Sequence, residues 1–309
     1  MKNFTEAYKK AKTVLDTTTA WPADWTKLLS VDAPVRKLYG PDGFAGSEAG
    51  TPGKLRQAVA EKSRGAVAAF FMGGGPGEVL YAAADKNAER AAALKFTKHV
   101  YRAHHKGGQD VWIYSPPKDH KAWIFDDLGG GEKAVQKRLD QETELFTDLQ
   151  KQHMCAALAL ALKISEDTRV KLGAADDKTK ALVRHWFLDA DCGDAQLTDA
   201  MTRLSAGFQK ISVCCNSSTL VFTDYPDWHA KRDKVMGGAI PGGEGGGFPV
   251  VYIEGAFTGM AGQAGNIWTC ARTVIHEFSH HEIKTEDHRY RHDGLKPDKA
   301  GFPYATAFP

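Results

Sequence analysis

The chain has 309 residues, and 42% of them are hydrophobic, which is enough for one large domain or two smaller ones. Lys and Arg total 40 against 38 Asp and Glu, so charge gives no reason to expect nucleic acid or an anionic membrane as a partner. No stretch approaches ~18 consecutive apolar residues, so we expect no membrane span. The N-terminal residues lack the apolar core of a secretory signal. We therefore expect secretion or export without a recognisable signal peptide, with a cytoplasmic location as the alternative.

Residues 1–131 are predicted to form a small α+β module of unknown role. The predicted elements are, in chain order, strands at 66–72 and 79–84, a helix at Ala88–His104, and strands at Val111–Tyr114 and Ala122–Phe125. The run Gly129–Gly131 follows them and is the clearest boundary signal in the chain. It predicts a second domain over residues 132–309.

The second domain is predicted to be mainly helical with a small sheet, so the fold class is α+β. Its predicted elements are helices at 132–164, 178–187 and 194–210, strands at 220–222 and Val250–Ile253, and a last helix that begins near Asn266. Val250–Ile253 is either an edge strand that pairs with an extended peptide substrate or an ordinary core strand.

All five cysteines lie in the second half of the chain. The odd count leaves at least one thiol unpaired in a monomer. One or two disulfides, for instance from Cys192 to Cys214 or Cys215, and buried free thiols are equally compatible with this pattern.

The predicted last helix contains His276-Glu277-Phe278-Ser279-His280, an HExxH motif. Positions four apart on a helix lie about 40° apart around its axis and about 6 Å along it. Two imidazoles with this spacing can bind one metal ion from the same face, with the glutamate beside them as a general base. The motif also arises by chance on ordinary helices, so a third ligand has to be found.

A catalytic zinc site needs three protein ligands. The position six residues after His280 is Glu286, so the third histidine of the longer HExxHxxGxxH pattern is absent. From the residues alone, four candidates for the third ligand remain: Asp287, His288, His292 and Asp293.

The segment Thr285-Glu286-Asp287-His288-Arg289-Tyr290 resembles the T-x-D-x-x-Y element of the deuterolysin-like aspzincins, which include the lysine-specific metalloendopeptidases. The resemblance covers about residues 150–297. It implies a zincin-type catalytic domain with Zn²⁺ held by His276, His280 and Asp287, with Glu277 as the general base and Tyr290 as a stabiliser of the oxyanion. The glycines that flank the element in the family are replaced here by Lys284 and Arg291.

These observations predict a zinc-dependent endopeptidase that acts on a peptide or protein substrate and needs no organic cofactor. One alternative is an effector of the same chemistry that acts on cell-wall peptide or on one specific target protein. Another is a binding protein in which the metal is only structural. An intact Glu277 argues against the last alternative, because a structural site has no use for a base.

Overall fold

The computed structural model describes residues 4, 7, 9, 11, 96, 99–104, 110–120, 143–217, 220–239 and 249–287. The predicted strands at 66–72, 79–84 and 122–125 and the predicted boundary at Gly129–Gly131 lie outside the described residues. The division into residues 1–131 and 132–309 therefore stays a prediction.

Three helices follow one another in the middle of the described chain: α8 (Asp148–Ala174), α9 (Asp177–Phe187) and α10 (Asp194–Cys215). Helix α8 begins at Thr147, whose hydroxyl accepts a hydrogen bond from the Gln150 backbone amide while the Gln150 side chain accepts one from the Thr147 amide. This reciprocal cap satisfies two backbone donors at the start of the helix. The predicted helix at 132–164 is therefore wrong over residues 143–147, and it ends ten residues too early.

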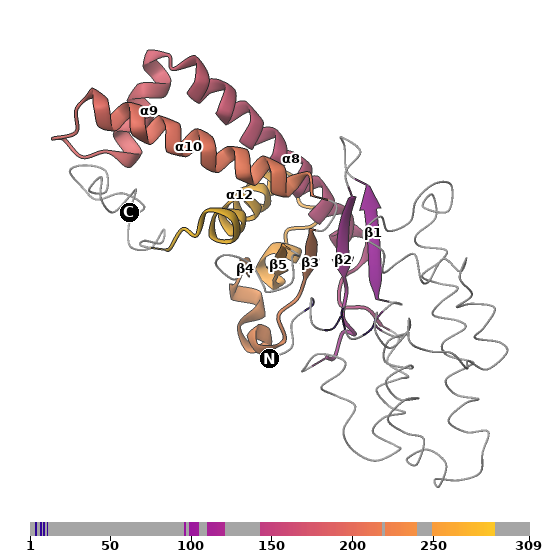
Figure 1. The fold of residues 1–309 in the computed structure, drawn as a ribbon. Coiled ribbons are helices and arrows are strands. Elements are labelled where there is room, and N and C mark those ends of the chain that lie inside the picture. Colours follow the sequence, from indigo (N-terminus) through magenta and orange to yellow (C-terminus); the bar gives the residue numbers. More distant parts are fainter. Residues whose placement is uncertain are drawn as a thin grey trace, which may run out of the picture.

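A five-stranded mixed sheet lies against these helices, in the order β1-β2-β3-β5-β4. The strands are β1 (Val100–His104), β2 (Asp110–Tyr114), β3 (Val221–Thr223), β4 (Gly237–Ala239) and β5 (Val250–Ile253). Strands β2, β3 and β5 run parallel, and β1 and β4 pair antiparallel at the two ends. In Figure 1, α8 and α10 run side by side as a long pair, and α12 lies close to α10. The predicted α+β class, mainly helical with a small sheet, is confirmed.

The sheet contradicts one prediction and decides between two alternatives. The predicted helix Ala88–His104 is a strand over residues 100–104, where the chain pairs with β2 from Val100↔Tyr114 to His104↔Asp110. The predicted strand Val250–Ile253 is β5, which lies between β3 and β4 and has all four residues buried. Of the two alternatives for this strand, the structure therefore favours the core strand over the edge strand. The described edge strand on this side is β4.

The main core joins the inner faces of α8, α10 and α12 to β2, β3 and β5. A smaller apolar cluster, which includes Leu172, Val183 and Leu197, packs the far ends of α8 and α10 against α9. All five cysteines are free thiols, so the fold contains no disulfide. None of the helices in the described part of the chain is both long and apolar enough to span a bilayer.

A cluster of four ionisable side chains lies beyond the carboxyl ends of β3 and β5. We call His120, Asp224, Arg232 and Glu254 the buried cluster. Asp224 and Glu254 are fully buried; Asp224 is ion-paired with Arg232 and lies 3.0 Å from His120 Nε2. Burial raises the pKa of Glu254 to about 8, and the negative charge of Asp224 acts in the same direction.

Candidate metal centre

Helix α12 (Ile267–Phe278) carries the first part of the HExxH motif. One side of the helix is fully buried in the main core through Cys270, Ala271, Val274 and Phe278. The His276 side chain points the other way and is 45% exposed. The amphipathic pattern therefore anchors the helix and leaves its first histidine open to solvent.

The helix continues as a π-helical turn, η4 (Ser279–Ile283), which contains His280. The turn ends at Lys284, whose φ of 64° lies in the left-handed region. The chain then folds back, because the Thr285 amide donates to the Ser279 carbonyl and the two side-chain hydroxyls lie 2.6 Å apart. This reversal brings Asp287 to the two histidines.

Three donor atoms converge at this point. His276 Nε2 lies 3.1 Å from His280 Nε2, and Asp287 Oδ1 lies 3.3 Å and 3.6 Å from these two nitrogens. Ligands about 2.0–2.1 Å from a tetrahedral zinc ion are roughly 3.3 Å from one another. The three side chains therefore fit one zinc ion without rearrangement.

Hydrogen bonding fixes the tautomer of His280. Its Nδ1 lies 2.6 Å from the backbone carbonyl of Thr285, which is an acceptor, so Nδ1 carries the proton and Nε2 keeps its lone pair. Burial lowers the pKa of His276, and the attraction of Asp287 for the protonated form opposes that effect. The lowered pKa favours the neutral imidazole that a metal ligand requires.

Glu277 lies beside the three donors and is only 5% exposed. Burial raises its pKa to about 8, the charge of Asp287 adds to the effect, and a hydrogen bond from the Ala239 amide opposes it. Ala239 is the last residue of β4, so the edge of the sheet runs beside the motif glutamate. The contact uses the backbone of Ala239, so the residue type at this position could not have predicted it.

Glu286, which precedes Asp287, is exposed. His288, Tyr290, His292 and Asp293 lie outside the described residues. A second set of donor atoms, from Cys214, His281 and Glu282, lies between α10 and η4. Its His281 Nδ1 is 2.5 Å from Glu282 Oε1. No sequence pattern indicates this set, because Cys214 is distant in sequence from His281 and Glu282.

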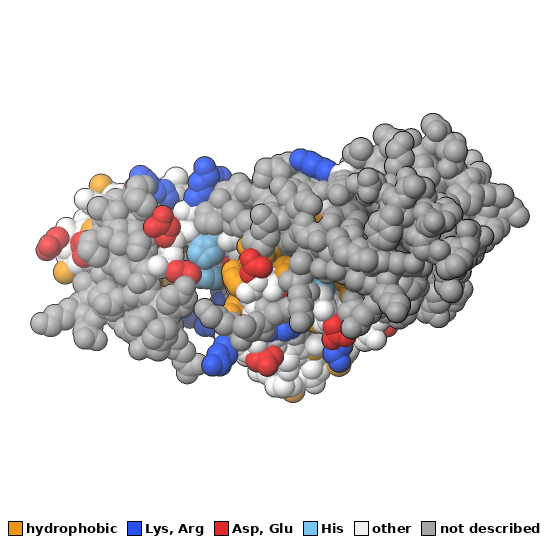
Figure 2. Space-filling view, turned by 90° about the horizontal axis from the view of Figure 1, so that it is seen from below, with side chains coloured by type: hydrophobic (Ala, Val, Ile, Leu, Met, Phe, Trp, Pro, Cys, Tyr) orange, Lys and Arg blue, Asp and Glu red, His pale blue; other side chains and the backbone are white. Residues whose placement is uncertain are grey.

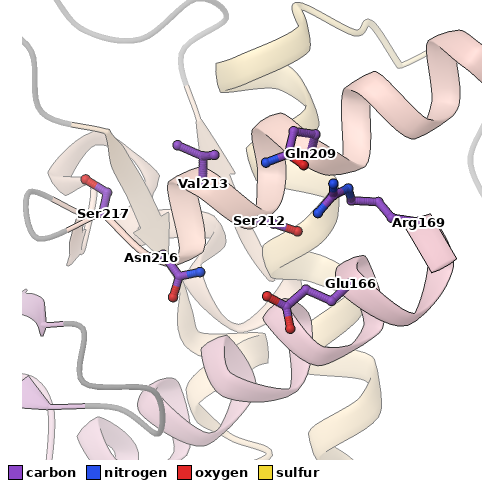
Figure 3. Close-up of a pocket in the computed structure, with 7 residues that line it drawn as sticks. All are labelled: Glu166, Arg169, Gln209, Ser212, Val213, Asn216 and Ser217. Carbon is purple, nitrogen blue, oxygen red and sulfur yellow. The ribbon is translucent and has the colours of Figure 1, made fainter.

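Two further features concern the surface of the described chain. In Figure 2, histidine surface is visible among acidic, basic and hydrophobic side chains, and no single charge dominates the described part of that face. A cleft of about 470 Å³ lies between α8 and α10. Figure 3 shows the side chains that line it. The cleft is lined by Glu166, Arg169, Gln209, Ser212, Val213, Asn216 and Ser217, and it includes none of the three converging donors.

Comparison with known proteins identifies the class of the C-terminal part. Residues 172–307 match the family model of the lysine-specific metallo-endopeptidases, the aspzincins. No curated protein and no solved structure matches the chain.

The aspzincin resemblance inferred over about residues 150–297 is thereby confirmed, since residues 172–307 are similar to that family. The match supports a zinc-dependent metallo-endopeptidase in general, a hydrolase whose substrate is a peptide or protein.

Proposed function

We propose that the protein hydrolyses internal peptide bonds at the centre formed by His276, His280 and Asp287, with Glu277 as the general base. The observation that carries the proposal is the convergence of three donor atoms within 3.1–3.6 Å of one another, with the Glu277 carboxylate alongside. Family membership supports the reaction class, and the geometry supports these residues for it.

A zinc ion bound there supplies Lewis acidity, which lowers the pKa of a water molecule and polarises a carbonyl group. Glu277 accepts the proton of the attacking water and then delivers it to the leaving amine. A carboxyl group with a pKa raised by burial is suited to this exchange, because it holds and releases a proton near neutral pH. The Ala239 amide orients the carboxylate. We further propose, from the family resemblance, that Tyr290 stabilises the oxyanion.

The edge of β4 is the proposed binding site for the substrate backbone. An extended peptide gains main-chain hydrogen bonds when it adds to an open strand edge. Strand β4 ends at Ala239, which donates a hydrogen bond to Glu277, so a peptide added there would pass beside the base. This proposal replaces β5, which is an interior strand.

The deciding experiment is Glu277→Gln, which keeps the size of the side chain and removes its basicity. Turnover of an unfolded protein substrate should fall by about a hundredfold or more, while zinc content and the circular dichroism spectrum stay unchanged. Glu286→Gln is the matched control, because Glu286 is an exposed acid of the same loop that is outside the donor set. Retained peptidase activity in Glu277→Gln would exclude the mechanism. A scaffold with a structural metal would show no chelator-sensitive cleavage in the native protein either.

We propose that residues 1–131 govern targeting or restraint of the enzyme, since every proposed ligand comes from 276–287. Strands β1 and β2 precede residue 131 but share the sheet with β3. A fragment of residues 132–309 should therefore bind zinc but unfold at a lower urea concentration than a fragment of residues 96–309. Equal midpoints would show that β1 and β2 add nothing to the stability of the catalytic domain.

An effector that acts on one target protein or on cell-wall peptide stays the alternative function. Cleavage of those substrates alone would favour it.

A further inference from the structure

We infer that Arg272 forms a subsite that selects an acidic side chain one or two residues after the scissile bond. This inference rests on the proposed function and specifies its substrate class. It concerns a face of α12 that the proposed mechanism does not use.

Arg272 lies one helical turn before His276 and one turn after Trp268, so the three side chains follow one face of α12. Arg272 and Trp268 are exposed, the latter by 56%. Arg272 and the proposed ligand His276 are about 6 Å apart along the axis of α12. Arg272 therefore lies next to the proposed site on the exposed face of the helix.

The Arg272 guanidinium stacks on Trp268, with its central carbon 5.8 Å from the ring centroid. This contact restrains the long side chain without using its hydrogen-bond donors. Arg272 forms no ion pair with any carboxylate of the described residues. An oriented cation with unused donors is suited to bind a carboxylate in a bidentate manner.

The direction of β4 indicates which substrate residue reaches Arg272. The Gly237 end of β4 lies beside Thr273, because a methyl group at Gly237 would be 3.7 Å from Thr273 Cγ2. The Ala239 end lies beside Glu277. Strand β4 thus runs alongside α12 in the same direction as the helix.

A peptide that pairs antiparallel with β4 runs from the Ala239 end towards the Gly237 end. The residues that follow the scissile bond then lie on the Arg272 side. Arg272 is about 6 Å along the helix from His276, and an extended chain covers that distance in about two residues. The subsite is therefore the first or second residue after the cleaved bond.

The expected preference is the opposite of the lysine preference in the description of the matched family. A lysine at this position would meet a like charge, whereas Asp or Glu would form charge-assisted hydrogen bonds. The natural substrates would then be protein segments with an acidic residue just after the cleavage point.

The test uses quenched fluorescent peptides of one sequence that carry Glu, Gln or Lys at the first or the second position after the cleavage point. For the zinc-loaded wild-type chain, kcat/KM should be about tenfold or more higher for Glu than for Lys at one of these positions. Arg272→Gln should remove the preference and Arg272→Glu should reverse it. Lys163→Glu, a charge reversal at an exposed residue of α8, should leave the preference unchanged.

Binding gives a second readout that does not need turnover. The affinity of the Glu277→Gln variant for the Glu peptide, measured by fluorescence anisotropy, should exceed that for the Lys peptide by a similar factor. Wild-type cleavage with no preference, or with a lysine preference at both positions, would overturn the inference and leave the proposed function intact. Absence of chelator-sensitive cleavage of every peptide would overturn both. Should Arg272→Glu fail to fold, the wild-type preference and Arg272→Gln decide the matter.

Discussion

The proposed metal centre and the buried cluster are two groups of ionisable side chains in the described chain, and they are built in opposite ways. In the buried cluster, Asp224 and Glu254 are fully buried, and Asp224 is directed at the cationic Arg232. At the metal centre, His276 is 45% exposed, and three donor atoms face a common point. In the buried cluster Asp224 is paired with Arg232, whereas at the proposed metal centre the lone pairs of three donor atoms face one another.

The difference shows how a functional group of side chains can be told from a structural one. Buried charges are tolerated when they are paired and hydrogen-bonded. Lone pairs that converge at distances suited to one cation are costly unless a ligand occupies them. Removing a member of each group should therefore have different consequences: loss of stability in one and loss of metal affinity in the other.

The largest expected effect is on stability, from Asp224→Ala. This change leaves Arg232 and His120 without their carboxylate and should lower the free energy of unfolding by about 3–5 kcal/mol. Urea denaturation monitored by circular dichroism measures it. The matched control is Asp167→Ala, because Asp167 pairs with Lys163 where the two side chains are 56% and 68% exposed. That control should cost less than ~1 kcal/mol. Equal losses in the two variants would remove the contrast.

The next effect is on metal affinity, from Asp287→Ala. Loss of one of three ligands should weaken zinc binding by about a hundredfold or more, because even residues that support a ligand contribute tenfold to a hundredfold. Competition with a chromogenic chelator measures the affinity. The stability of the metal-free protein should change little, in contrast to Asp224→Ala. Unchanged zinc affinity, or a large loss from His288→Ala or Asp293→Ala instead, would assign the third ligand elsewhere.

The smallest effect is a change in pH dependence, from Glu254→Gln. Burial raises the pKa of Glu254 from 4.5 to about 8, so the folded state holds this proton more tightly than the unfolded state. The stability of the wild type should therefore fall as pH rises from about 4.5 to about 8. Glu254→Gln cannot ionise, so it should resemble the wild type at pH ~5 and be more stable at pH ~8. Parallel curves of urea midpoint against pH would show that Glu254 is ionised throughout.

Local patterns were enough to predict the parts of the fold that depend on neighbouring residues. Helix α9, strand β5 and the start of α12 agree with the sequence predictions within one residue. The HExxH spacing fixed the relation between His276 and His280, because it is a property of the helix itself. These elements carry their own caps or periodic apolar residues.

The structural features that the sequence did not predict depend on contacts between residues distant in sequence. The segment Val100–His104 continues an alanine-rich helical pattern but forms a strand because β2 is available as its partner. The interior position of β5 depends on β4, a three-residue strand that contains two glycines. The contact between Ala239 and Glu277 depends only on the backbone. Residue types carry no information about such contacts.

Lys284 has a consequence for how such enzymes are detected in other genomes. It adopts the left-handed conformation, with a φ of 64°, where the aspzincin pattern has glycine. Hydrogen bonds from the Lys284 amide to the His280 carbonyl and from the Thr285 amide to the Ser279 carbonyl hold the turn in that shape. The shape of this turn can thus persist after its glycine is lost. A search pattern that demands glycine before the threonine would miss this protein, whereas one that asks for a hydroxyl side chain at positions 279 and 285 would retain it.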